Sequence, residues 1–441
     1  MALHHILVIG RTDVGRRVCA LMQESGTRVT HLHEPSDTQL REALTPDIDG
    51  VAVLLHDDIA ALRYGLIVHH IRPMLPLFVA MFDLTARAQL RAAVPECVVL
   101  SPAAISVPAM VAAAIDPRAS AIRRQDSSDV RRWVSITAAG HEGARIAPFT
   151  TPEHIRNRGR IGRLLGQLRP FDSGSGVLLA GALGLIGVII ADTLVGLQHS
   201  GLLRSLYDAT RTTATISAPQ LPDEPWILIW ATIAALLVMA FTAMFAAGIV
   251  NYLLSGRHIA LAGRRVAPRS GHVIVVGMGQ VGLRLAQELR QLGVAVIGIE
   301  QSAHARSLQI ARQCGIPVLI GDGASRALLN AAGAPRALAL VAAGSEDRDN
   351  IAVAVSALAV NPELRIVLRS GTDDAIKETQ SLFHIGSVVD VNGLTASFVA
   401  SSLGGTVPYA VISSETGDVA VDALGEATGA WQPHETRCTC T

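Results

Sequence analysis

His272-Val-Ile-Val-Val-Gly-Met-Gly-Gln-Val-Gly282 is the stretch of sequence that decides the fold of this chain. It opens with an apolar run, which is typical of a buried strand, and leads through a G-x-G-x-x-G pattern into a helix that we expect over 283–292. Gly277 permits a tight turn, Gly279 lets a pyrophosphate approach the backbone, and Gly282 lets helix and strand pack closely. The N-terminus of that helix offers N–H groups and partial positive charge to phosphates.

A second expected strand, over 294–299, strengthens the prediction of a dinucleotide site. It ends in Glu300, which stands 18 residues after Gly282. A carboxylate at this point of a Rossmann fold accepts hydrogen bonds from ribose hydroxyls and repels a 2′-phosphate. The pattern favours NAD or NADH as the cofactor, with ATP, ADP or another adenosine nucleotide as the alternative. A Rossmann scaffold that has lost its ligand is the structural alternative.

Composition narrows the class of protein. Of the 441 residues, 50% are apolar and 17% are charged, against about 25% charged in an average soluble protein. The 37 basic and 37 acidic side chains cancel, so neither a disordered chain nor a nucleic-acid-binding protein is indicated. The five cysteines are scattered, and we expect neither a disulfide framework nor a metal site. The shortage of charge suggests that part of the chain lies in a lipid bilayer.

Two long uncharged stretches predict membrane helices. One runs from Ser173 to Ala191, and the other covers the 31 residues from Trp226 to Gly256. About 20 apolar residues span the hydrocarbon core of a bilayer, so we expect spans over 176–197 and 226–254. Asp192 lies in the first span, where it is either an interfacial residue or a functional carboxylate.

The arginines orient these two spans in the cell membrane. Ten arginines lie between Arg123 and Arg169 and four follow the second span, whereas the intervening loop holds only Arg204 and Arg211. Because positive residues stay on the cytoplasmic side, both termini are expected in the cytoplasm and the 198–225 loop outside.

The chain after Glu300 continues as a particular succession of strands. A strand ending in Gly321-Asp322 is followed by strands over 337–342 and 365–369 and by an apolar segment over 383–389. This succession resembles the nucleotide-binding half of RCK domains, the regulators of potassium conductance that also occur in Trk-type transport subunits. The resemblance covers about 271–395. It implies a nucleotide-binding domain that assembles in pairs and rings and transmits ligand binding to a membrane gate.

The same resemblance implies which residues contact the nucleotide. They are the residues of the glycine-rich loop and two acids at strand ends: Gly277, Met278, Gly279, Gln280, Val281, Gly282, Glu300 and Asp322. The residues after Asp390 are too few for the usual second lobe of an RCK domain, so 396–441 is expected to be a C-terminal tail.

The N-terminal segment reads as a degenerate relative of this unit. A strand over 5–9 leads into the turn Gly10-Arg11-Thr12-Asp13-Val14-Gly15, and a second strand ends at Glu34. Thr12 stands at the place of the middle glycine, where its Cβ would crowd a pyrophosphate. We favour a structural, dimerising Rossmann-like domain over 1–116, although Arg11 offers a charge that could hold a phosphate.

The fold class that follows is α/β. Two Rossmann (RCK-like) domains with doubly wound parallel sheets flank a two-helix transmembrane hairpin. The expected segments are the domains 1–116 and 271–395, an Arg-rich cytoplasmic linker and juxtamembrane segment 117–172, the transmembrane pair 173–256, a linker 257–270 and the tail 396–441.

The outer loop resembles the pore helix of two-span potassium channels. An aromatic-bearing helix near Tyr207 leads into a threonine-rich stretch, whose candidate pore residues are Thr210, Thr212, Thr213, Ala214, Thr215, Ile216 and Ser217. Potassium filters use glycine-containing backbone to aim carbonyls at the ion, and this stretch contains no glycine. Potassium selectivity is therefore not supported, and an ordinary extracellular loop is the alternative.

Three functions are compatible with this organisation. The first is a nucleotide-regulated, channel-like membrane protein in which the nucleotide domain moves the second span; it would be a homo-oligomer, a tetramer, because one hairpin cannot enclose a pore. The second is a non-conducting regulatory or assembly subunit of a cation transporter. The third, a membrane-anchored NAD-dependent oxidoreductase, is disfavoured, because the sequence offers no substrate domain and only His384 as a catalytic candidate. We therefore do not expect an enzyme.

Overall fold

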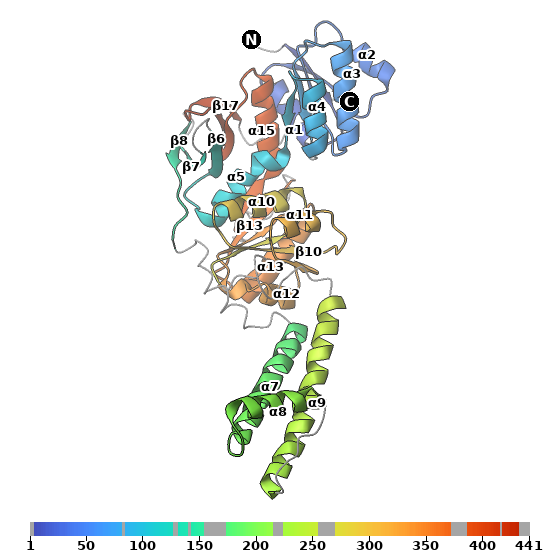
Figure 1. Cartoon of the computed structure of the whole chain (residues 1–441). Coiled ribbons are helices and arrows are strands. Elements are labelled where there is room, and N and C mark those ends of the chain that lie inside the picture. Colours follow the sequence, from blue (N-terminus) through green and yellow to red (C-terminus); the bar gives the residue numbers. More distant parts are fainter. Residues whose placement is uncertain are drawn as a thin grey trace. The chain divides into compact units, whose positions relative to one another are not determined.

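The computed structural model describes residues 4–81, 84–126, 131–139, 143–153, 173–214, 224–254, 270–371, 386–414 and 417–431 (Figure 1). The chain divides into two compact units. The first unit contains Met1–Gly159 together with Ala267–Thr441, and the second contains Arg160–Val266. The first unit therefore holds both Rossmann-like halves, and the second holds the apolar helices.

The N-terminal half is built on a five-stranded parallel sheet with the order β2-β1-β3-β4-β5. Its three inner strands are almost wholly apolar and are buried along their whole length, because helices cover both faces of such a sheet. The strands are β1 His5–Ile9, β2 Arg28–Leu32, β3 Gly50–Leu54, β4 Leu77–Ala80 and β5 Val98–Leu100. The helices are α1 Asp13–Glu24, α2 Asp37–Ala43, α3 Asp58–Ile71, α4 Leu84–Ala93 and α5 Pro102–Ile115.

The C-terminal half has a six-stranded parallel sheet with the order β11-β10-β9-β12-β13-β14. The strand order reverses between β9 and β12, which is where doubly wound sheets bind ligands at their carboxyl edge. The strands are β9 Val273–Val276, β10 Val296–Glu300, β11 Val318–Ile320, β12 Ala339–Ala342, β13 Arg365–Ser370 and β14 Ser387–Asp390. The helices are α10 Gln280–Gln291, α11 Ser307–Gln313, α12 Arg326–Ala331, the 3-10 helix η2 Ala334–Arg336, α13 Asp347–Val360 and α15 Val391–Leu403. The predicted fold class is confirmed.

The two halves exchange helices within one chain. Helix α15, which follows the C-terminal sheet, packs against α1, and α5, which follows the N-terminal sheet, packs against α10 (Figure 1). Val18 of α1 and Val399 of α15 lie in one hydrophobic core, and Met110 of α5 and Leu285 of α10 lie in another. The N-terminal half thus acts as the pairing partner of the C-terminal half of the same chain.

Two small antiparallel sheets lie where the sequence predicted a linker and a tail. The first consists of β6 Ala121–Asp126, β7 Arg131–Ala138 and β8 Ala144–Pro148, and the second of β15 Ala410–Ser414, β16 Gly417–Val421 and β17 Ala427–Trp431. Ile136 of β7 and Ile412 of β15 belong to a hydrophobic cluster that contains residues of both sheets.

The prediction of a linker over 117–172 is therefore wrong for residues 121–148, and that of a tail over 396–441 is wrong for 410–431. In β7, buried Val134 and Ile136 alternate with Ser135 and exposed Thr137, which is the period of a half-buried strand. The strand begins with Arg131 and Arg132, and these charges favoured the interpretation of this segment as an Arg-rich linker. Residues 154–172 and 432–441 lie outside the described part of the chain.

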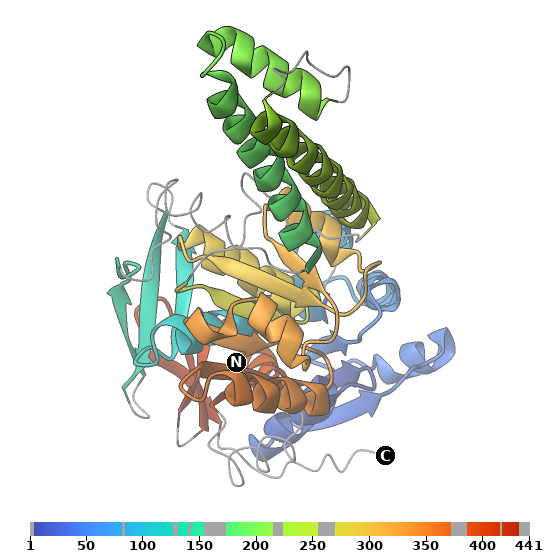
Figure 2. The same cartoon turned by 90° about the horizontal axis from the view of Figure 1, so that it is seen from below.

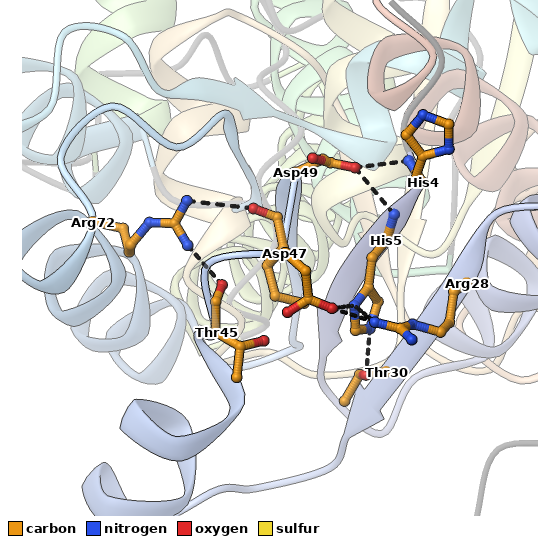
Figure 3. A network of polar contacts seen from close by, with 9 residues as sticks. His4, His5, Arg28, Thr30, Thr45, Asp47, Asp49 and Arg72 are labelled. Carbon is orange, nitrogen blue, oxygen red and sulfur yellow. Dashed lines mark hydrogen bonds and ion pairs between the residues drawn. The ribbon is translucent and has the colours of Figure 1, made fainter.

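A polar network ties together the amino ends of the N-terminal strands. The ring of His5 lies between Asp47 and Thr30, with Nδ1 2.8 Å from Asp47 Oδ2 and Nε2 2.8 Å from Thr30 Oγ1 (Figure 3). Arg28 pairs with Asp47, and hydrogen bonds from Thr45 and His5 hold the pKa of the Asp47 carboxyl well below its usual range. The network lies at the edge of the sheet opposite to the glycine turn. It therefore stabilises the sheet and does not contact the turn.

In the C-terminal half, His272 is the corresponding buried histidine just ahead of β9. Its Nε2 donates a 2.8 Å hydrogen bond to the carbonyl of Ala332, while Nδ1 has no hydrogen-bond partner among the described residues. The side chain is fully buried, and burial lowers its pKa from 6.5 to about 4. The imidazole is therefore neutral in the folded protein at physiological pH.

We expect this histidine to make the first unit less stable at mildly acidic pH. Because the folded-state pKa lies below that of the unfolded chain, the unfolded chain binds more protons between pH 6.5 and 4. The contribution of neutral His272 to the free energy of unfolding is therefore fully present above pH 6.5. It falls by up to about 3 kcal/mol as the pH decreases toward 4. Thermal unfolding of the detergent-solubilised chain across this range measures the effect. His272→Gln keeps a donor for Ala332 and should flatten the pH dependence; an unchanged slope would contradict the assignment.

The second unit contains α7 Ser173–Gly196, α8 Leu202–Thr213 and α9 Pro225–Leu254. Helices α7 and α9 run side by side (Figures 1 and 2), and each contains a segment long and apolar enough to cross a membrane, Gly176–Gly196 and Pro225–Val250. The helices approach closely at glycines, since a Cβ on Gly181 would lie 2.6 Å from the amide nitrogen of Phe245. Small residues at such contacts are characteristic of helix packing in membranes.

Candidate nucleotide-binding site

The glycine-rich loop connects β9 to α10 at the point where the strand order reverses. Gly277 has φ of +85°, which favours glycine, and a Cβ at this position would lie 2.9 Å from the amide nitrogen of Gly344. A Cβ on Gly282 would lie 2.0 Å from the carbonyl oxygen of Gly277, so this glycine lets the helix start against the strand. A Cβ on Gly279, in contrast, would meet no described atom within 4 Å. The middle glycine therefore faces open space, as expected of the position that a pyrophosphate approaches.

The N-terminus of α10 leaves its first N–H groups available to a ligand. Gly279 is the N-cap residue and offers no side chain to accept their hydrogen bonds. The side chains of Met278 and Val281 are buried, so these two residues can present only their backbone to a ligand, whereas Gln280 is exposed. The first turn of α10 thus combines the positive end of a helix dipole with N–H groups that the described residues leave without a capping side chain.

Glu300 and Asp322 lie at the ends of the next two strands of the same edge. One carboxylate oxygen of Glu300 accepts a 2.9 Å hydrogen bond from the amide of Met278, and the other accepts a 3.1 Å bond from the amide of Ser302. Asp322 accepts a 2.9 Å hydrogen bond from the amide of Ala324 and is exposed. The structure therefore places Glu300 against the glycine-rich loop, which it braces, and Asp322 one strand further out.

Sequence reasoning missed the loop next to Gly277, in which Gly344 follows β12. Asn350, which is 3% exposed, accepts a 2.9 Å hydrogen bond from the Gly344 amide and donates to the Gly344 carbonyl at 3.1 Å. A Cβ on Gly344 would lie 2.8 Å from the side-chain oxygen of Asn350. The signal for this second loop is Ala343-Gly344, a glycine directly after a buried strand.

The corresponding turn of the N-terminal half is closed by its own side chains. Thr12 Oγ1 accepts a 3.1 Å hydrogen bond from the amide of Gly15 and donates to the carbonyl of Leu54 at 3.0 Å. His31, whose pKa is lowered by burial, donates from Nε2 to the carbonyl of Gly10 at 2.8 Å. The donor at Gly15 is thus used within the protein, in contrast to the free first turn of α10.

This difference predicts one nucleotide per chain. Calorimetric titration of the purified protein should give a stoichiometry near one, although each chain holds two Rossmann-like halves. The Thr12→Ala variant, which removes the hydroxyl from the N-terminal turn but keeps a Cβ there, should retain that value. Two equivalent sites per chain would contradict the prediction.

In the pore-like loop, the threonine hydroxyls bond within α8. Thr210, Thr212 and Thr213 donate to carbonyls at Leu206 or Tyr207, Asp208 and Ala209 at distances between 2.6 and 2.9 Å. Ala214 caps the end of α8, whereas Thr215, Ile216 and Ser217 lie outside the described residues. In this arrangement, the hydroxyl groups of the described threonines bond within the helix, and the assignment of 210–217 to a pore-like loop stays a prediction.

Asp192 finds its partner on the neighbouring span. Trp230 Nε1 of α9 donates a 2.9 Å hydrogen bond to Asp192 Oδ1 of α7. One turn later, Gly196 lies against α8, where a Cβ would come 3.0 Å from the Cβ of Ser205. The carboxylate thus joins the two spans near the end at which α8 packs, which favours a structural role over an ion-binding one.

Residues 273–389 match the TrkA-N domain family. An uncharacterized protein of Methanothermus fervidus is 25% identical over 190 residues, which cover 41% of this chain and 29% of the relative. Potassium channel protein 1 of Methanocaldococcus jannaschii is 24% identical over 106 residues, which cover 24% of this chain and 32% of the relative. The matches therefore span about a third of the length of these relatives.

The solved structure of the GsuK channel is similar over 90% of this chain and 63% of its own, with a TM-score of 0.51 and 14% identity. At this identity the likeness concerns the fold. Together with the family match, it shows that residues 273–389 form a TrkA-N (RCK) domain in a chain with an RCK-like α/β fold, related to potassium channel proteins.

Proposed function

We propose that this chain is the subunit of a nucleotide-regulated, channel-like membrane protein. Its TrkA-N domain binds NAD or NADH and transmits the bound state to α9. The observation that carries the proposal is the contrast between the two turns: Gly279 faces open space at an uncapped helix, whereas Thr12 closes the N-terminal turn. Glu300 at the ribose position favours NAD(H), and ATP or ADP is the alternative ligand.

The order of elements supports the coupling to the membrane. Only 18 residues separate the end of α9 from β9, so a change in the nucleotide domain has a short connection to the second span. A curated relative is named a potassium channel protein. Potassium selectivity is not part of the proposal, because the loop after α8 contains no glycine for a carbonyl-lined filter.

The membrane arrangement is part of the same proposal. Arginines flanking both spans favour a cell-membrane protein with two spans and both termini in the cytoplasm. Since one hairpin cannot enclose a pore, the functional assembly would be a homotetramer, with lipid around the exposed apolar side chains of α7 and α9.

A second candidate is a non-conducting regulatory or assembly subunit of a cation transport system. The hydroxyl groups of the described threonines in α8, all bonded within that helix, favour it. The third candidate, a membrane-anchored NAD-dependent oxidoreductase, would gain support only from NADH turnover with a small carbonyl compound; its catalytic candidate, His384, lies outside the described residues.

Ion flux and nucleotide binding should be measured on the same purified protein. Rubidium or thallium flux into proteoliposomes is followed without nucleotide and with NAD, NADH or ATP, and binding is titrated in parallel. Nucleotide-dependent flux that Gly279→Asp abolishes supports the channel. Binding without flux supports the regulatory subunit, and absence of both overturns the proposal.

A further inference from the structure

A row of part-buried hydrogen bonds extends from the nucleotide loop along the carboxyl edge of the C-terminal sheet. It begins at Gly277, which packs backbone to backbone against Gly344. Asn350 holds Gly344 at both its amide and its carbonyl and also donates to the carbonyl of Arg369 at 3.0 Å. The loop of β9 is therefore linked to the end of β13 through a single buried side chain.

The row continues from β13 to helix α15. Asp347 accepts hydrogen bonds from the Ser370 hydroxyl at 3.2 Å and from the Gly371 amide at 3.1 Å. The carbonyl of Gly371 accepts a 2.8 Å hydrogen bond from the side chain of Asn392, and a Cβ on Gly371 would lie 2.9 Å from that side-chain nitrogen. Because Asn392 belongs to the first turn of α15, the end of β13 and the start of this helix are fixed to each other.

The row ends on the contact between the two halves. Asp390 caps α15 by accepting a 2.9 Å hydrogen bond from the Gly393 amide, and its other oxygen pairs with Arg17 of α1. The side chains of Arg17 and Asp390 are only 11% and 24% exposed, so the pair is weakly screened by solvent. Any shift of the first turn of α15 therefore acts directly on α1 of the N-terminal half.

We propose that this row couples the nucleotide-bound state of the Gly277 loop to the contact between the two halves, with Asn350 and Asn392 as positioning residues. The inference rests on the proposed nucleotide binding. Phosphates that bind the first turn of α10 fix the loop, and Gly344 is in backbone contact with that loop. Packed, buried groups change between discrete arrangements more readily than they deform continuously, so a small change at the loop can reach α15. By linkage, the Arg17–Asp390 pair must then influence nucleotide affinity.

The test combines a double-mutant cycle with hydrogen exchange of the full chain in detergent. Arg17→Met should change the NAD dissociation constant by about fivefold or more, and Asn392→Ala should remove most of this effect. NAD should alter amide exchange in α1 of the wild-type protein but should not alter it in the Asn392→Ala variant. This variant should still bind NAD, because Asp390 keeps α15 capped. Arg63→Met, which breaks an exposed pair with Asp37 away from the row, is the matched control and should leave both readouts unchanged.

The outcomes separate the two proposals. If NAD binds but Arg17→Met and Arg63→Met have the same affinity, or if α1 responds to NAD equally in Asn392→Ala, the coupling is refuted and nucleotide binding stands. If neither NAD nor ATP binds the wild-type protein, both proposals fail. Equal thermal unfolding of the Asn392→Ala and wild-type proteins confirms that the comparison concerns folded chains.

Discussion

Replacing Gly279 by aspartate should abolish nucleotide binding without loss of the fold. The position has φ of −66° and ψ of −162°, which any residue can adopt, and a Cβ there meets no described atom within 4 Å. A carboxylate at an N-cap is itself stabilising by ~1 kcal/mol, since it accepts hydrogen bonds from the first turn. The same carboxylate would occupy the donors that phosphates need and repel their charge. Each charge-assisted hydrogen bond contributes about 1.5–3 kcal/mol, so the loss of two weakens binding on the order of 100-fold or more.

The measurement pairs a nucleotide titration with thermal unfolding, and Gly282 provides the contrasting variant. A Cβ at Gly282 would lie 2.0 Å from the carbonyl oxygen of Gly277, so Gly282→Val should lower the unfolding temperature as well as the affinity. Gly279→Asp should lower the affinity alone. Binding within threefold of wild type in Gly279→Asp would mean that the nucleotide does not lie at this loop.

The parts of this site that the sequence predicted are those encoded within a short stretch. Gly277, Gly279 and Gly282 lie within six residues, and the pattern of strand, turn and helix fixes their backbone environment locally. Glu300 was predictable because the acid follows directly from the second strand. The hydrogen bond from the Met278 amide to the Glu300 carboxylate was not predictable, because a sequence pattern does not give the rotamer of a side chain.

The parts that the sequence did not predict depend on contacts between distant residues. Asn350 bonds to Arg369, 19 positions away, and Arg17 pairs with Asp390, 373 positions away. Apolar periodicity predicted the two Rossmann-like halves. The apolar face of a helix can pack against any apolar surface, however, so the sequences of α5 and α15 did not indicate that each helix packs on the other half.

Enlarging either of two glycines at the hairpin contact should separate the membrane helices. A Cβ on Gly248 of α9 would lie 2.5 Å from the Cα of Leu178, and one on Gly181 of α7 would lie 2.6 Å from the amide nitrogen of Phe245. These neighbours are backbone atoms that cannot rotate away, so Gly248→Leu and Gly181→Leu force the helices apart. Overpacking of this kind costs about 1–3 kcal/mol or more.

Gly187→Leu is the matched control for these variants, because Gly187 lies on the same helix as Gly181 and a Cβ there meets no described atom within 4 Å. Separation of the helices should also break the hydrogen bond from Trp230 to Asp192, which shifts the fluorescence of that indole. We therefore expect a lower unfolding temperature in detergent and an altered Trp230 emission for Gly248→Leu and Gly181→Leu, and wild-type values for Gly187→Leu. Equal unfolding temperatures and equal Trp230 emission in all three variants would mean that α7 and α9 do not pack through this face. The short connection from the nucleotide domain would then act on an α9 helix that has no fixed partner in its own hairpin.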